Sequence, residues 1–130
     1  ASEQTLRDRQ HFLRMNGKEV FKLAVRVMAD SCERVLTACG KHSDDVAWFI
    51  PHQANIRIVE AVADQLHVGL DRFPINLDRY GNTSAASIPL ALEEAWSAGR
   101  IKHGDLILLV AFGAGLTWGA TLLRWHEPSP

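Results

Sequence analysis

Apolar residues recur at intervals of three and four along three stretches of the chain, which predicts three amphipathic helices. The first covers residues 18–39 and the second covers residues 55–67, and a glycine closely follows each of them. The third runs from Ser84 or Ser87 to residue 97, and either serine could be its N-cap. Pro89 leaves the start of this helix open, because a proline beyond the first turn removes a hydrogen bond.

Short apolar runs between these helices predict the strands of a sheet. "VAWFI" (46–50) is a continuous apolar run closed by a proline, as expected of a buried strand. "RFPINL" (72–77) is a weaker candidate, because its proline favours an edge or an irregular strand. "DLILLVAF" (105–112) and "LTWGATLLRW" (116–125) flank a "GAG" turn and predict a hairpin. Strands that alternate with helices indicate an α/β fold, with a mixed and mostly parallel sheet covered by helices.

Composition excludes several classes of function. The 130 residues suffice for one domain with a modest core, and a net charge of −1 gives no support for a nucleic-acid or membrane surface. No apolar run approaches the roughly 20 residues that span a bilayer, and the polar first residues carry no targeting signal. We therefore expect a soluble cytoplasmic protein with neither a nucleic-acid nor a membrane partner. The six histidines show no paired spacing, so we expect no metal site.

The two cysteines, Cys32 and Cys39, lie on one face of the first predicted helix. Two turns of helix separate them by about 10 Å, which is too far for a disulfide bond. We therefore expect buried, reduced thiols.

Polar motifs follow the predicted strands, at the sheet edge where α/β proteins bind ligands. His52 in "IPHQANIR" comes directly after a buried strand, and Asn82 in "YGNTSAAS" precedes the third helix. A neutral imidazole can exchange a proton near physiological pH, and a carboxamide donates hydrogen bonds at every pH. Each also has a structural interpretation: a histidine bonded at a helix start, and an asparagine in a Gly-Asn turn. Asn55 is predicted to be an N-cap, and Gln53 has no assignable role.

Four motifs together resemble the C-terminal half of β-ketoacyl-acyl-carrier-protein synthase III, the initiating condensing enzyme of bacterial fatty-acid synthesis in the thiolase superfamily. In chain order they are "MNGKEVFK" (15–22), "PHQANIRI" (51–58), "GNTSAASIPLALEEA" (81–95) and "GDLILLVAFGAGLTWG" (104–119). The resemblance covers residues 13–125, between a polar N-terminal segment (1–12) and a tail (126–130). It implies half of a five-layered α-β-α-β-α structure.

The resemblance also implies roles for individual residues. In that family a cysteine takes an acyl group from acyl-CoA, and malonyl-acyl-carrier protein then loses CO2 and attacks the acyl-cysteine. His52 and Asn82 match the histidine and asparagine that hydrogen-bond the malonyl thioester oxygen, and no cofactor beyond these substrates is implied. The residues that match the shaping of this active site are Phe112, Gly113, Ala114 and Gly115. Ala114 stands where many relatives have glycine, although an alanine keeps its N–H group.

Two further groups match binding positions of the family. Those near the pantetheine arm of CoA are Asn16, Gly17, Ala54 and Asn55. Those on the basic surface that receives the acidic carrier protein are Arg57, which matches best, and Lys22 and Arg26.

The nucleophile of the family has no match in this chain, because Cys32 and Cys39 lie in the wrong element. The resemblance therefore implies a partner, the N-terminal half that carries the cysteine, and a homodimer. We expect a fragment, a C-terminal domain or one part of a split protein, inactive alone because half of the fold would expose an apolar face. Other possibilities are a CoA- or carrier-binding module without catalysis, a structural dimer partner, and a polyketide-priming relative.

Overall fold

The computed structural model describes residues 1–12 and 15–127. Its α-helices are α1 (Glu3–Arg7), α2 (Gly17–Ala38), α3 (Ile56–Gln65), α4 (Leu77–Tyr80) and α5 (Ser87–Ser97). Its strands are β1 (Trp48–Pro51), β2 (Leu106–Gly113) and β3 (Thr117–Arg124). The three long helices and the hairpin are confirmed, and β1 begins two residues later than predicted. The predicted domain start at residue 13 and the end of the predicted tail lie outside the described residues.

The three strands form one mixed sheet in the order β1-β2-β3. β1 runs parallel to β2, with Trp48 opposite Ile107, and β3 runs antiparallel to β2 over its whole length. The antiparallel pair of β2 and β3 is longer than the parallel pair of β1 and β2. The predicted strand at residues 72–77 does not form. Residues 73–76 are instead irregular and connect a 3₁₀ turn (Leu70–Arg72) to α4. Pro74 between them has no N–H group to give to a strand.

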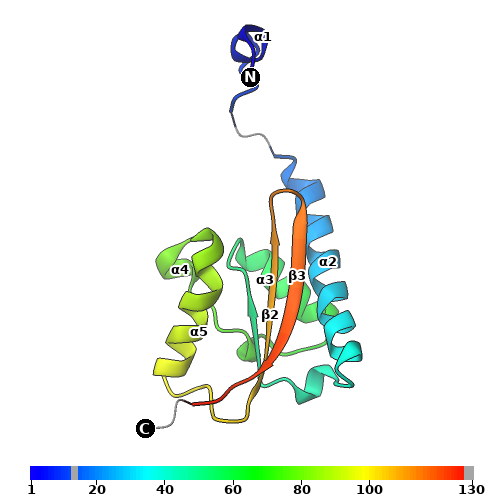
Figure 1. The fold of residues 1–130 in the computed structure, drawn as a ribbon, viewed down its shortest axis with the longest axis vertical. Coiled ribbons are helices and arrows are strands. Elements are labelled where there is room, and N and C mark those ends of the chain that lie inside the picture. The colour runs from blue at the N-terminus through cyan, green and yellow to red at the C-terminus, as the bar shows by residue number, and fades with distance from the viewer. Residues whose placement is uncertain (13–14, 128–130) are drawn as a thin grey trace.

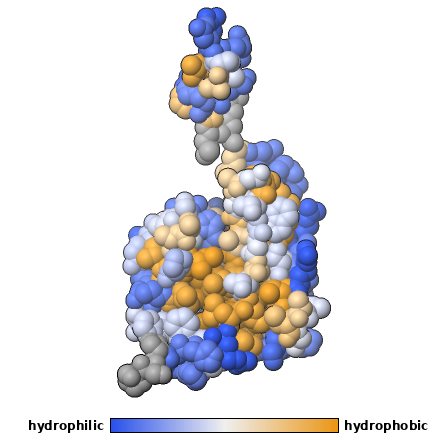
Figure 2. All heavy atoms as spheres, viewed as in Figure 1, coloured by the Kyte–Doolittle hydropathy of each residue, from blue (hydrophilic) through white to orange (hydrophobic). Residues whose placement is uncertain are grey.

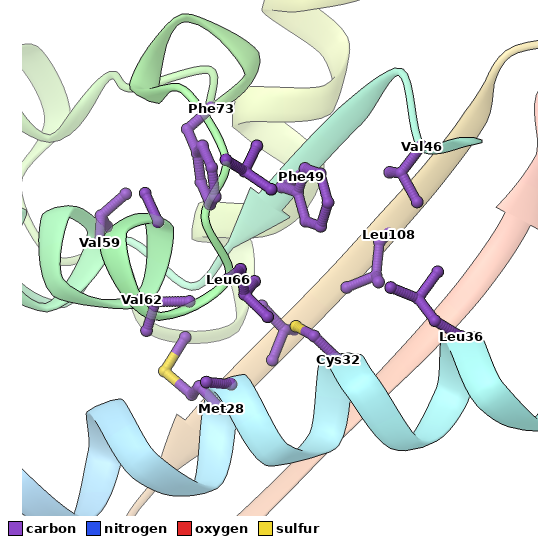
Figure 3. Packing of buried hydrophobic residues seen from close by; sticks show 14 residues of the cluster. Met28, Cys32, Leu36, Val46, Phe49, Val59, Val62, Leu66, Phe73 and Leu108 are labelled. Carbon is purple, nitrogen blue, oxygen red and sulfur yellow. The ribbon is translucent and has the colours of Figure 1, made fainter. Parts of the chain in front are cut away.

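β2 divides the core into two parts, because its alternate side chains point to opposite faces of the sheet. Leu108 and Val110 pack with α2 and α3 on one face, where Met28 and Cys32 are also buried. Figure 3 shows Met28, Cys32 and Leu108 converging between α2, α3 and the strands. Ile107 belongs to a second cluster on the other face, under α5. Each fully buried Leu, Ile, Val or Phe contributes about 1.5–3 kcal/mol.

The face of the sheet beside α5 is only partly covered. Figure 2 shows a continuous apolar area there, between α5 and β3. The apolar side chains that pack at the margin of the second cluster without being fully buried include Trp48, Leu109, Leu123 and Trp125. The Nε1 atom of Trp125 is buried and has no hydrogen-bond partner among the residues that the structure describes.

Helix termini explain several of the polar residues. Asn55 is the N-cap of α3, as predicted, because its Oδ1 accepts the Arg57 N–H at 3.0 Å. The expectation that Ser84 or Ser87 caps α5 is wrong, since Ala86 occupies that position without a side-chain hydrogen bond. Pro89 falls in the first turn of α5, where its missing N–H costs no helical hydrogen bond. No helix within residues 1–12 and 15–127 is long and apolar enough to cross a bilayer.

Candidate active site

His52 lies directly beyond the carboxyl end of β1. Its backbone N–H donates to the Val110 carbonyl at 2.8 Å, which extends the pairing of β1 with β2 by one residue. Its ring is half-buried, and Nδ1 lies 2.6 Å from the Ser87 hydroxyl oxygen. Burial lowers the pKa of His52 below its ordinary value, because a charged ring would lose hydration. The imidazole is therefore neutral at physiological pH, and its Nε2 atom has no hydrogen-bond partner among the described residues.

Asn82 lies in the turn between α4 and α5. Gly81 before it has φ +68° and ψ −160°, a conformation that only glycine adopts without strain. The Asn82 Oδ1 atom accepts the Ser84 N–H at 3.0 Å, and Ser84 itself has a left-handed φ of 53°. This hydrogen bond orients the carboxamide and leaves its Nδ2 amino group exposed, without a partner in the described part of the chain.

The start of α5 brings the two motifs together. Ser87, the first residue of α5, contacts His52, and Asn82 belongs to the turn that leads into the same helix. The end of β2 lies beside His52, because Pro51 pairs with Val110 and Phe112 follows on the same strand. Both motifs thus place hydrogen-bonding side chains near the start of α5, and His52 lies beyond the carboxyl end of a parallel strand, where α/β proteins bind ligands.

The hairpin tip lies at the same end of the molecule as the start of α2 (Figure 1). Phe112 is half-buried and packs against the first core cluster, and Gly113 ends β2. The backbone of Ala114 does not have a positive φ, so an alanine fits this position without strain. Gly115 has a φ of +141°, which L-residues rarely adopt.

The predicted binding residues lie on α2, on α3 and in the loop before α3. Asn16 is the N-cap of α2, with its Oδ1 atom accepting the Glu19 N–H at 3.5 Å, and Gly17 begins that helix. Lys22 on α2 forms an exposed ion pair with Glu19 at 3.5 Å. The remaining candidates are Arg26, exposed on α2; Arg57, exposed at the start of α3; and Ala54 and Asn55, just before α3.

Gln53 has a structural role that the sequence pattern did not indicate. Its side chain is fully buried. Its Nε2 donates to the carbonyls of Pro51 and Pro74, at 3.0 and 3.3 Å. Its Oε1 accepts the Asn76 N–H at 3.4 Å. Gln53 therefore ties the end of β1 to the segment that leads into α4.

A second polar cluster joins α4 to α5. The Glu94 carboxylate accepts hydrogen bonds from the Asn76 side chain at 2.9 Å and from Arg79 and Tyr80 at 3.0 Å. The bond from Asn76, together with its neighbours, lowers the pKa of Glu94, and the bond to Glu94 raises the pKa of Tyr80. Because Asn82 follows α4 directly, this cluster and Gln53 hold the turn that carries it. Only the structure reveals these contacts, since they join residues 14 to 23 positions apart.

Neither cysteine lies at this edge of the sheet. Burial raises the pKa of Cys32 to about 12, and the nearby Glu33 charge adds to this effect. Cys39 is the C-cap of α2, and its exposure contradicts the expectation that both thiols are buried. Within the described chain, no three His, Cys, Asp or Glu residues are placed to hold a metal ion.

The fold and the position of these motifs define a class of protein. The chain superposes on the crystal structure of 3-oxoacyl-[acyl-carrier-protein] synthase III from Aquifex aeolicus with a TM-score of 0.86 and 52% identity, covering 88% of this chain and 37% of that one. A priming β-ketosynthase from the R1128 polyketide pathway is also similar, with a TM-score of 0.82, 34% identity and coverage of 89% and 35%. The fold is therefore thiolase-like.

Residues 36–125 match the family model described as the C-terminal domain of 3-oxoacyl-[acyl-carrier-protein] synthase III, and the chain belongs to this family. The β-ketoacyl-[acyl-carrier-protein] synthase III 2 of Deinococcus radiodurans is 56% identical over 113 residues. That match covers 87% of this chain and 33% of the relative. The chain thus spans about a third of the relative's length, in its C-terminal half.

Proposed function

We propose that this chain forms the decarboxylating half of a β-ketoacyl-acyl-carrier-protein synthase III that initiates fatty-acid synthesis. His52 and Asn82 are the catalytic residues of that half, and both donate hydrogen bonds to the thioester oxygen of malonyl-acyl-carrier protein. The observation that carries the proposal is the meeting of both motifs at the start of α5, with His52 Nδ1 2.6 Å from Ser87. His52 Nε2 and Asn82 Nδ2 are left as donors for a ligand.

The chemistry of decarboxylation suits two neutral donors. As the bond between the malonyl carboxylate and its α-carbon breaks, the electron pair moves into the thioester and charge develops on the carbonyl oxygen as an enolate. Donors held in place before the reaction stabilise this charge without reorganising, and removal of one typically costs 10²- to 10³-fold in kcat, about 3–4 kcal/mol. The lowered pKa of His52 supports this role, because the ring must stay neutral yet keep a proton on Nε2.

The carbon–carbon bond also needs an acyl-thioester on a cysteine, which this chain does not supply. With a pKa of about 12, Cys32 carries no thiolate at physiological pH. Cys39 lies at the C-terminal end of α2, whereas the hairpin tip lies at the N-terminal end of that helix. The nucleophile belongs to the N-terminal half of the enzyme, whether on the same chain or another. The uncovered apolar face beside α5 is the surface on which we place that half. The complete enzyme is expected to be a homodimer of such paired halves.

The two substrates are acyl-CoA and malonyl-acyl-carrier protein. Asn16, Gly17, Ala54 and Asn55 lie at helix starts, where they would line the entry of the pantetheine arm. Arg57 and Arg26 are exposed and have no ion-pair partner in the described residues, and Lys22 has only the solvated Glu19. Such cations steer an acidic carrier protein and act mainly on its association rate. Because a priming polyketide ketosynthase has the same fold, polyketide priming is the alternative pathway for the same chemistry.

Single substitutions test the proposal in the intact enzyme, with both halves present. His52→Ala and Asn82→Ala should each lower the rate of malonyl-thioester decarboxylation by about 10²- to 10³-fold. His103→Ala, an exposed histidine in the loop before β2, is the matched control and should leave the rate unchanged. Unchanged decarboxylation in both site variants would refute the catalytic assignment. Retained thioester binding in the same variants would then favour a non-catalytic CoA- or carrier-binding module.

A further inference from the structure

The Ser87 hydroxyl group lies between the His52 ring and the Gln53 backbone. Ser87 is the first residue of α5 and is only 1% exposed. Its Oγ atom lies 2.6 Å from His52 Nδ1 and accepts the Gln53 N–H at 3.2 Å. These are the only hydrogen bonds of the Ser87 hydroxyl within residues 1–12 and 15–127.

The direction of each hydrogen bond follows from the number of protons. A serine hydroxyl has one proton and two lone pairs, and a backbone N–H can only donate. Gln53 therefore occupies one lone pair of Oγ, and the buried O–H proton still needs an acceptor. His52 Nδ1 is the acceptor within reach, so Nδ1 carries a lone pair. In a neutral imidazole the ring proton then lies on Nε2.

We propose that Ser87 is a positioning residue that holds His52 in the Nε2–H tautomer and orients its ring. This inference rests on the proposed function, in which Nε2–H donates to the thioester oxygen. In the other tautomer Nε2 would direct a lone pair at the developing enolate and oppose the reaction. The lowered pKa of His52 agrees with this arrangement, because Ser87 supplies a neutral donor rather than a carboxylate that would favour a charged ring.

A merely structural role is the competing explanation, since Ser87 also satisfies the buried Gln53 N–H. Ser87→Ala removes both functions and Ser87→Thr keeps the hydroxyl, so threonine should rescue whatever depends on that group. Ser97→Ala removes an exposed serine at the far end of the same helix and is the matched control. All variants are made in the intact enzyme with both halves present.

The first readout is the tautomer itself, measured by ¹⁵N NMR on protein with labelled histidine. The resonances of His52 are assigned by their loss in His52→Gln. We expect a protonated Nε2 and an unprotonated, accepting Nδ1 in the wild-type protein, in Ser97→Ala and in Ser87→Thr. Ser87→Ala should change the Nδ1 shift and populate the second tautomer. A wild-type spectrum with the proton on Nδ1 would overturn the inference even if Ser87→Ala fails to fold.

The second readout is decarboxylation kinetics. Ser87→Ala should lower kcat by less than the 10²- to 10³-fold expected for His52→Ala, with KM little changed, and Ser87→Thr should recover most of the loss. If His52→Ala keeps full activity, the proposed function fails, while the NMR result still decides the tautomer. If His52→Ala is inactive but Ser87→Ala retains wild-type kcat and tautomer, only the role of Ser87 fails.

Discussion

Replacement of Gln53 by methionine tests whether the buried polar bridge holds the site together. Methionine has nearly the same length and volume, so the substitution removes the amide without opening a cavity. Three groups lose their partner: the carbonyls of Pro51 and Pro74, and the Asn76 N–H. An unsatisfied buried polar group costs about 1–3 kcal/mol. Two of the three bonds are long, at 3.3 and 3.4 Å, so we expect a total loss of about 2–4 kcal/mol.

Urea unfolding of the intact protein measures this loss, and hydrogen–deuterium exchange locates it. The Asn76 amide should exchange faster in Gln53→Met, because its acceptor is gone. Gln65→Met, at the exposed end of α3, is the matched control and should change stability by less than about 0.5 kcal/mol. If Gln53→Met unfolds at the wild-type urea concentration and the Asn76 amide keeps its protection, the reasoning about this bridge is wrong.

Three further predictions follow from single groups. At mildly alkaline pH, iodoacetamide should label the exposed Cys39 of the folded protein and leave Cys32 unmodified, as mass spectrometry of tryptic peptides would show; labelled Cys32 would contradict its burial. The folded state lowers the pKa of His52, so as pH falls below about 6.5 this histidine is protonated in the unfolded chain before it is protonated in the folded one. The contribution of neutral His52 to the free energy of unfolding is therefore present above that pH and is lost below it. His52→Gln should therefore reduce the fall in melting temperature between about pH 7.5 and pH 5, and an identical fall would argue against the shift. Gly81→Ala should destabilise the protein by about 1–3 kcal/mol, against little change for Gly17→Ala, because Gly81 has a φ of +68° and Gly17 has no such positive φ.

The sequence pattern predicted the long elements because their burial is periodic. α2 and α3 follow from apolar residues on one helical face, and β2 follows from an apolar run that is buried on both sides of the sheet. His52 and Asn82 could also be identified from the sequence, because polar residues directly before or after such apolar elements are easily recognised. The family motifs then suggested a shared role, which stays a proposal.

The remaining features depend on contacts between distant parts of the chain. Ser87 has the pattern of an N-cap, and only the approach of β1 shows that it contacts a residue 35 positions away. Gln53 likewise meets Pro74, 21 positions away, although its sequence context suggests an ordinary loop residue. At residues 72–77 the apolar character reflects real burial, because Phe73 stacks on Phe49 with ring centroids 5.2 Å apart, yet the segment turns instead of extending. An apolar pattern in the sequence therefore indicates that a segment is buried, but it does not indicate which residues the segment contacts.

The most direct test of the central claim is a crystal structure of the intact enzyme with a malonyl-thioester analogue that cannot lose CO2, such as one with a sulfonate in place of the carboxylate. The proposal predicts the thioester oxygen within about 2.7–3.1 Å of both His52 Nε2 and Asn82 Nδ2. A thioester oxygen bound by other donors, with the two side chains turned away from it, would contradict the proposal.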